Sequence, residues 1–197
     1  MKLSEIKSEE LNNLLKNGGV IGFVTDTVWG IGCLPNSKDG AEKIYKIKHR
    51  DLKKPLILMS NDTKNLIKYV KEVPQKAEEL INKFFPGALT VVLSKSELTE
   101  NYITSAKNTV GIRVPANKTF SKLCSLVEGG VLATTSANFS GEEPSLDFKT
   151  TVDKLSNVVD IIFEDEGETA KGIPSTVVSA VNNEIKVLRK GSINTDE

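Results

Sequence analysis

The chain has 197 residues, 39% of them hydrophobic and 26% charged, proportions that are ordinary for a soluble globular protein. This length allows one domain with a core that needs neither disulfides nor structural metals. The 26 basic and 26 acidic residues cancel, so the overall charge gives no support for nucleic-acid binding. We therefore expect one domain over residues 1–197, with its core from about residue 8 to residue 193.

Cysteine and histidine usage narrows the chemistry further. Cys33 and Cys124 lie far apart without CxxC spacing, which is typical of reduced thiols inside a cell. His49 is the single histidine, so a histidine-rich metal site is excluded and a Ser-His-Asp triad has one candidate. We recognise no signal peptide and no apolar run of membrane-spanning length. We expect a soluble, cytoplasmic protein with no resident metal and no membrane partner.

Hydrophobic periodicity predicts alternating helices and short buried strands. Helices are expected from a Ser8 cap to Gly18, from Ser37 to about Arg50, from Asn61 to Val70, from Pro74 to a stop at Pro86-Gly87, over Thr119–Val127, and around Phe148–Leu155. Strands are expected at Val20–Val24, Leu56–Met59, Ala88–Leu93, Thr109–Pro115, Val131–Ala133 and Val159–Phe163, with a hairpin of Ser175–Ala180 and Ile185–Arg189. Crossovers together with a hairpin predict an α/β fold, a twisted mixed sheet flanked by helices.

The stretch Val131–Ser145 is the most informative part of the chain. Its apolar start predicts a strand, and the sequence then changes abruptly to Thr-Thr-Ser-Ala-Asn-Phe-Ser-Gly from Thr134 onward. Ligands bind at the carboxyl ends of strands in open α/β sheets, and small hydroxyl and amide groups can donate to phosphate oxygens. A simple turn after a strand has a similar composition, so the stretch alone leaves both interpretations open.

Other predicted strand ends carry similar groups. They are Thr25/Thr27, Thr109/Arg113, Ser175/Thr176 and Arg189, and Lys48, Arg50 and Lys54 add a basic rim. The rim could also simply complement the dipole of the helix that it ends. A site of this content suits a polyphosphate plus a small zwitterion. GxxxxGK[ST] and GxGxxG are absent, so any nucleotide is held without a P-loop or a dinucleotide fingerprint.

Several of these motifs together resemble the YrdC-type family of threonylcarbamoyl-adenylate synthases, in the family's order from about Leu11 to Ile193. They are TDTVWGIG at Thr25–Gly32, Lys48-His49-Arg50 with Lys54-Pro55-Leu56, Phe85-Pro86-Gly87, Arg113-Val114-Pro115, SANFSG at Ser136–Gly141, Pro174-Ser175-Thr176-Val177 and Arg189-Lys190-Gly191. The resemblance implies a YrdC-like fold with a basic concave face. It also implies that L-threonine, bicarbonate or carbon dioxide, and ATP are combined into threonylcarbamoyl-adenylate and pyrophosphate, with Mg²⁺ assisting.

Matching positions imply the site residues. The threonine pocket would be formed by Thr27, Met59, Arg113, Thr134 and Ser175, and ATP would be held by Arg50, Lys54, Thr109, Ser136, Ser145 and Arg189. The catalytic pairs Lys-x-Arg and Ser-x-Asn correspond to Lys48, Arg50, Ser136 and Asn138. Some longer relatives carry His in place of Met59, as well as a linker and a second domain, so the chain resembles the short, single-domain form. No general base is identified.

Partners and alternatives follow from the same resemblance. Downstream transferase proteins would pass the threonylcarbamoyl group to the adenosine beside the anticodon of tRNA, and the chain itself would bind tRNA weakly at most. One alternative is a non-catalytic RNA-binding module in tRNA or rRNA maturation that uses the basic rim. Another is a carbamoyl-adenylate domain that serves a different acceptor. Arg113 itself has two explanations, a ligand carboxylate or an internal pair with an acidic residue such as Asp26.

Overall fold

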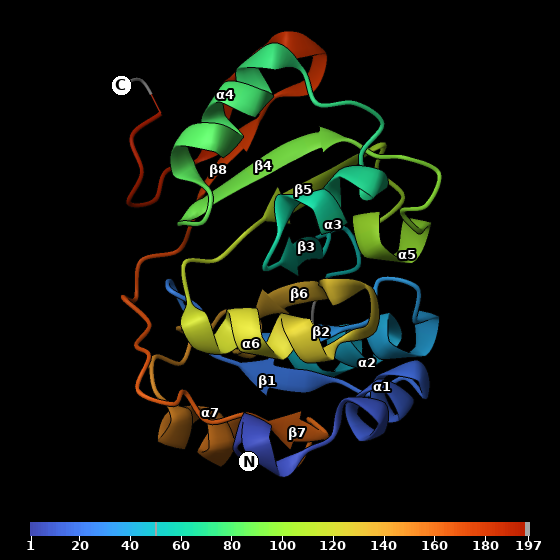
Figure 1. Cartoon of the computed structure of the whole chain (residues 1–197), viewed down its shortest axis with the longest axis vertical. Helices are drawn as coiled ribbons and strands as arrows, with labels where there is room; N and C mark the ends of the chain where they lie inside the picture. Colours follow the sequence, from blue (N-terminus) through green and yellow to red (C-terminus); the bar gives the residue numbers. More distant parts are fainter. Residues whose placement is uncertain (50, 196–197) are drawn as a thin grey trace.

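One mixed sheet of nine strands runs through the molecule (Figure 1), and the computed structural model describes residues 1–49 and 51–195. The strands are β1 (Ile21–Phe23), β2 (Gly30–Cys33), β3 (Ile57–Ser60), β4 (Leu89–Ser94), β5 (Thr109–Arg113), β6 (Val131–Ser136), β7 (Ile161–Ile162), β8 (Thr176–Ser179) and β9 (Lys186–Arg189). Their order across the sheet is β7-β1-β2-β6-β3-β5-β4-β8-β9. Three neighbouring pairs are parallel and the other five are antiparallel, so the predicted mixed sheet is confirmed.

Helices cover both faces of this sheet. The α-helices are α1 (Ser8–Lys16), α2 (Lys38–Lys48), α3 (Thr63–Leu66), α4 (Gln75–Phe84), α5 (Asn101–Thr104), α6 (Lys118–Leu126) and α7 (Phe148–Leu155). Four 3₁₀ turns, η1 (Leu3–Glu5), η2 (Ile67–Tyr69), η3 (Glu128–Gly130) and η4 (Val181–Asn183), complete the described elements. Helices α1 and α6 share one apolar cluster with strand residues such as Phe23 and Leu132, whereas α2, α4 and α7 belong to a second cluster. Strands buried on both faces explain why their sequences read as uninterrupted apolar runs.

Strand β2 was not predicted, and its glycines explain why. A Cβ on Gly30 would lie 2.7 Å from Cε2 of Phe23, and one on Gly32 would lie 3.1 Å from Cε1 of the same ring. Glycine weakens a strand pattern in the sequence, yet it is required where another group approaches the backbone this closely. The polar segment from Thr25 to Val28 is therefore the turn of a β1–β2 hairpin rather than an open strand end.

Other predicted boundaries also shift. β6 continues through Ser136, so the hydroxyl residues that begin at Thr134 lie on the strand itself rather than after it. β7 is shorter than expected and α5 was missed. The expected Ser8 cap is wrong: Lys7 occupies the N-cap, and the Ser8 hydroxyl donates to the Leu126 carbonyl (2.6 Å), tying α1 to α6. The predicted C-terminal hairpin is confirmed as β8–β9.

Candidate functional site

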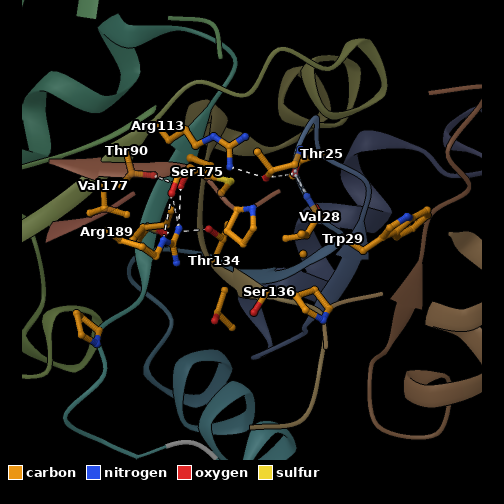
Figure 2. Close-up of a pocket in the computed structure, with 18 residues that line it drawn as sticks. Thr25, Val28, Trp29, Thr90, Arg113, Thr134, Ser136, Ser175, Val177 and Arg189 are labelled. Atoms are coloured by element: carbon orange, nitrogen blue, oxygen red, sulfur yellow. Dashed lines mark hydrogen bonds between the residues drawn. The ribbon is translucent and has the colours of Figure 1, made fainter. Parts of the chain in front are cut away.

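A cavity of about 340 Å³ opens at the centre of the sheet between β2, β3, β5, β6 and β8 (Figure 2). All five residues of the predicted threonine set line it: Thr27, Met59, Arg113, Thr134 and Ser175. Of the predicted ATP set, Ser136 and Arg189 line it. The structure thus brings together residues from six separate segments of the chain, and the role of each stays a prediction.

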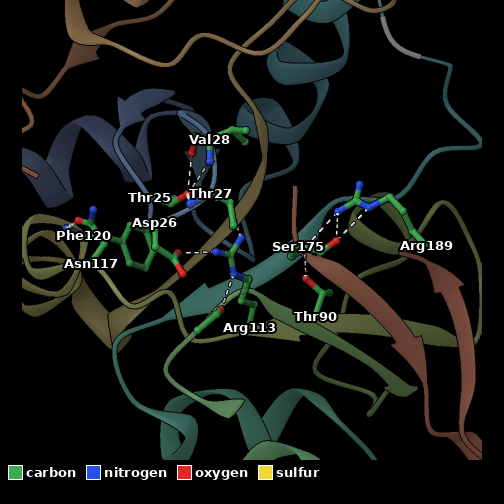
Figure 3. A network of polar contacts seen from close by, with 11 residues as sticks. Thr25, Asp26, Thr27, Val28, Thr90, Arg113, Asn117, Phe120, Ser175 and Arg189 are labelled. Carbon is green, nitrogen blue, oxygen red and sulfur yellow. Dashed lines mark hydrogen bonds and ion pairs between the residues drawn. The ribbon is translucent and has the colours of Figure 1, made fainter. Parts of the chain in front are cut away.

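Arg113 is the most constrained charged group of the cavity. Its side chain is almost completely buried, and it donates from Nε to the Gly87 carbonyl (3.0 Å) and from Nη1 to Thr27 Oγ1 (2.9 Å). Its Nη2 forms an ion pair with Asp26 Oδ1 (Figure 3). Burial lowers the pKa of Arg113, and the charge and hydrogen bond of Asp26 oppose that shift. The internal pair considered for Arg113 is therefore present.

The internal contacts of Arg113 do not use all of the N–H groups of its guanidinium. Five N–H groups are available, and the bonds to Gly87, Thr27 and Asp26 use one each from Nε, Nη1 and Nη2. A second N–H on each Nη atom thus has no acceptor among the described residues. Both explanations of Arg113 are compatible, because internal partners fix the fork that a carboxylate could meet.

Thr27 is oriented by its own turn. Thr25 Oγ1 donates to the Val28 carbonyl (2.6 Å) and accepts from the backbone N–H of Thr27 (3.2 Å), a local pattern that stabilises tight turns. The two threonine hydroxyls are 3.1 Å apart. The threonine-rich turn therefore presents Thr27 Oγ1 to Arg113 as a fixed acceptor.

Arg189 reaches the opposite side of the cavity because of an irregularity in the β8–β9 ladder. Val177 pairs with Arg189 but Val178 pairs with Val187, so Leu188 is an extra residue of β9. This bulge places Arg189 on the same face as Val177, and both line the cavity. A sequence pattern that assumes regular alternation does not predict this placement.

Ser175 links Arg189 to the core of the sheet. Its carbonyl accepts from Arg189 Nε (3.1 Å) and Nη2 (2.8 Å), and its hydroxyl is 3.1 Å from Nη2. The Ser175 hydroxyl also lies 2.8 Å from Thr90 Oγ1. Thr90 was not predicted as a site residue; the available indication was a hydroxyl inside the apolar run Ala88–Leu93.

Lys48, Ser136 and Asn138 form a second buried cluster beside the cavity. Lys48 Nζ donates to the carbonyls of Ser136 (2.5 Å) and Asn138 (2.6 Å) and to Asn138 Oδ1 (3.0 Å), and it is only 1% exposed. Ser136 Oγ donates to the same Oδ1 (2.5 Å), and Asn138 Nδ2 donates to the Glu142 carbonyl (2.6 Å). The cluster holds the loop at residues 136–142. Its ammonium contacts the chain itself and is not among the groups that line the cavity.

The remaining predicted ATP residues are more dispersed. Thr109 begins β5 and Arg113 ends it, so the expectation that one strand end presents both is wrong. The Ser145 hydroxyl is buried and has no hydrogen-bond partner within the described residues, while its carbonyl accepts from Trp29 (3.2 Å). The carbonyl of Lys54 accepts from the Tyr45 hydroxyl (2.7 Å). Arg50 lies outside the described residues, and the roles of all four stay predictions.

Two expectations concern metals and membranes. Within residues 1–49 and 51–195, no three His, Cys, Asp or Glu side chains come together as a group that could hold a metal ion. None of the helices in the described part of the chain combines the length and hydrophobicity of a membrane span.

Fold and site together define a class: an α/β protein whose central cavity combines two arginines with several hydroxyls and can bind a small anionic or zwitterionic molecule without a P-loop. The chain belongs to the Sua5/YciO/YrdC family, whose model carries the description "telomere recombination" and matches residues 13–191. It has a YrdC-like fold.

Individual relatives agree with this assignment. A threonylcarbamoyl-AMP synthase of Pyrococcus abyssi is 32% identical over 196 residues, which are 100% of this chain and 57% of that protein. The crystal structure of P. abyssi Sua5 complexed with L-threonine superposes with a TM-score of 0.86 at 29% identity, covering 97% of this chain and 56% of the other. Escherichia coli YciO superposes with a TM-score of 0.83 at 26% identity, covering 95% and 90%. The chain therefore spans little more than half of the archaeal relatives and almost all of YciO.

Proposed function

We propose that the protein is an L-threonylcarbamoyladenylate synthase, a nucleotidyltransferase that takes L-threonine, carbon dioxide or bicarbonate, and ATP. One observation carries the proposal: the five residues of the predicted threonine set, which come from five separate segments, line a single cavity. The L-threonine bound to P. abyssi Sua5 supports the same ligand here. The match to a synthase that is longer than this chain supports the reaction class.

The geometry suggests how threonine would be bound. Its carboxylate would meet the two remaining N–H groups of Arg113, a charge-assisted pair that a fixed guanidinium binds well. Thr27, Thr134 and Ser175 place hydroxyls around the same space. Met59 pairs with Arg113 across the parallel β3–β5 ladder and supplies an apolar contact beside it.

Adenylation would take place toward Arg189 and Ser136. The threonine nitrogen bonds to the carbon of carbon dioxide and loses a proton, which gives a carbamate. A carbamate oxygen then attacks the α-phosphorus of ATP, and the bond from that phosphorus to the β-phosphate oxygen breaks to release pyrophosphate. Such transfers depend mainly on positioning and charge neutralisation. Arg50, Lys54 and Arg189 would neutralise the phosphates, and Lys48 and Asn138 would position Ser136.

Mg²⁺ fits this scheme as part of the substrate. Among the residues that the structure describes, no carboxylate lines the cavity, so a magnesium ion would be held mainly by ATP phosphates and water. Transfer of the product to tRNA would be performed by partner proteins.

The decisive experiment incubates the purified chain with ATP, L-threonine and bicarbonate and identifies the products by mass spectrometry. We expect threonylcarbamoyl-adenylate and pyrophosphate, each dependent on both threonine and bicarbonate. Release of inorganic phosphate instead, or indifference to threonine, would refute the assignment. Replacing threonine by other amines in the same assay tests for a different carbamoyl acceptor. Tight tRNA binding without any product would favour an RNA-binding module.

A further inference from the structure

The two arginines that line the cavity have unlike charge environments. Arg113 is paired with the Asp26 carboxylate, and the two side chains are only 3% and 11% exposed. Arg189 donates to the carbonyl and hydroxyl of Ser175, which are neutral acceptors. Figure 3 shows Asp26 and Arg189 on opposite sides of the Arg113 guanidinium. Within the described part of the chain, one guanidinium is thus neutralised by a carboxylate and the other is not.

Asp26 itself does not line the ligand cavity. It lines a separate cavity of about 600 Å³ together with Thr27 and Gly87, both of which also bond to Arg113. Asp26 thus lies behind the guanidinium, on the side away from Arg189, and would act on a ligand through its charge rather than by direct contact.

This arrangement has an electrostatic consequence. In a poorly solvated site, the Asp26 charge opposes any anion that approaches Arg113, and the opposition grows with the charge of the anion. A zwitterionic amino acid brings one carboxylate and no net charge, whereas a phosphate group brings close to two negative charges. Burial is the main cause that lowers the pKa of Arg113, and the charge of Arg189 adds a smaller contribution in the same direction.

We propose that Asp26 is a positioning residue that determines specificity: it keeps the Arg113 end of the cavity close to neutral, so that this end takes an amino-acid carboxylate and rejects phosphate. Phosphate groups are thereby directed to the Arg189 end. The inference rests on the proposed function, which assigns the Arg113 end to the amino acid. It also gives a reason why the ATP phosphates would bind at Arg189 and not at Arg113.

Asp26→Asn removes the negative charge of Asp26 and keeps the shape of its side chain. Asparagine has nearly the same shape, and its Oδ1 can still accept from Arg113 Nη2, but the guanidinium then carries an uncompensated charge. Glu128→Gln is a matched control, because it removes one acidic charge from an exposed ion pair with Lys16 outside the site. Combining Asp26→Asn with Arg113→Gln removes both charges and restores neutrality.

The test is calorimetric titration of each protein with inorganic phosphate and with L-threonine. We expect Asp26→Asn to bind phosphate at least tenfold more tightly than the wild type, in competition with threonine, and the double variant to lose this gain. Glu128→Gln should match the wild type. Phosphate affinity within twofold of wild type in Asp26→Asn, with or without a lower melting temperature, overturns the proposal. So does a gain that persists in the double variant.

A second measurement needs no variant and covers the case in which Asp26→Asn does not fold. In the wild type, phosphate should compete with ATP and not with threonine, and competition with threonine overturns the proposal. Because these titrations require no turnover, they separate this inference from the proposed function, which depends on pyrophosphate release by the wild type.

Discussion

Two buried cations define two halves of the site, and their hydrogen bonds differ in kind. In the arginine half (Asp26, Thr27 and Arg113), three of five N–H groups are used internally and the guanidinium lines the cavity. In the lysine half (Lys48, Ser136 and Asn138), an ammonium with three N–H groups has four oxygen neighbours within the chain. A buried cation in a ligand site is therefore not necessarily a ligand-binding group. Whether such a cation can bind a ligand depends on how many of its N–H groups have no acceptor within the protein.

Lys48→Met should produce the largest effect and disrupt the lysine half. It leaves the carbonyls of Ser136 and Asn138 without their Lys48 donor, and the Asn138 side-chain oxygen keeps only the Ser136 hydroxyl as a donor. We expect about 3 kcal/mol of lost stability and a melting temperature lower by roughly 6–12 °C. Turnover should fall about 100-fold as the loop at residues 136–142 shifts.

Lys46→Met is the control for that experiment, since Lys46 is exposed on the same helix. Calorimetry and pyrophosphate release should both stay near the wild-type values. A Lys48→Met protein that melts normally yet is inactive would contradict the positioning role and favour direct contact with the reacting groups.

Arg113→Lys disrupts the arginine half. Lysine keeps the charge but loses the fork that donates to Asp26 and Thr27 and that, in the proposed function, also binds a ligand carboxylate. We expect the threonine KM to rise about tenfold or more, because charge-assisted hydrogen bonds contribute roughly 1.5–3 kcal/mol. The ATP KM should change less than about twofold, since Arg189 is retained. A lower melting temperature with an unchanged threonine KM would show that Arg113 only supports the sheet.

Ser136→Ala makes a milder change in the lysine half. The hydroxyl donates to Asn138 Oδ1, but Lys48 still holds that oxygen and both carbonyls. Turnover should fall about fivefold, which corresponds to about 1 kcal/mol of activation free energy. The melting temperature should stay within about 2 °C, because only one hydrogen bond is lost. Ser140→Ala, at an exposed position of the same loop, should leave both values unchanged. A parallel loss of stability and activity in Ser136→Ala would indicate a purely structural hydroxyl.

The sequence predicts the elements of the fold well where burial dominates. Helices α1, α2, α4, α6 and α7 follow from apolar spacing, and the β8–β9 hairpin from its asparagine turn, where Asn182 and Asn183 adopt positive φ. It does not predict β2, because Gly30 and Gly32 weaken the strand pattern. The Phe23 ring lies so close that it favours glycine at both positions. Local propensity cannot report a contact between strands.

The site shows the same contrast between features that the sequence predicts and features that it does not. The family resemblance groups Thr27, Met59, Arg113, Thr134 and Ser175, and these five residues line one cavity, while their role in binding threonine stays a prediction. The hydrogen bonds that orient them were beyond the sequence: the saturated ammonium of Lys48, the Leu188 bulge that brings Arg189 to the cavity, and the contact of Thr90 with Ser175. Each depends on register or on side-chain direction, which periodicity does not specify.

Thr90→Val should have the smallest effect. It tests the Ser175 hydroxyl, which lies between Thr90 and Arg189. Valine has nearly the shape of threonine, so packing in β4 is kept while the 2.8 Å contact with the Ser175 hydroxyl is lost. Ser175 stays tied to Arg189, so one neutral hydrogen bond changes and we expect a threefold to fivefold rise in the threonine KM. Thr90 and Ser175 both line the cavity, but Ser175→Ala measured beside it should give a larger rise, because it removes the hydroxyl contact with Arg189 as well as the contact with Thr90. Equal effects of the two variants would mean that the Ser175 hydroxyl acts only through Thr90 and does not contact the ligand.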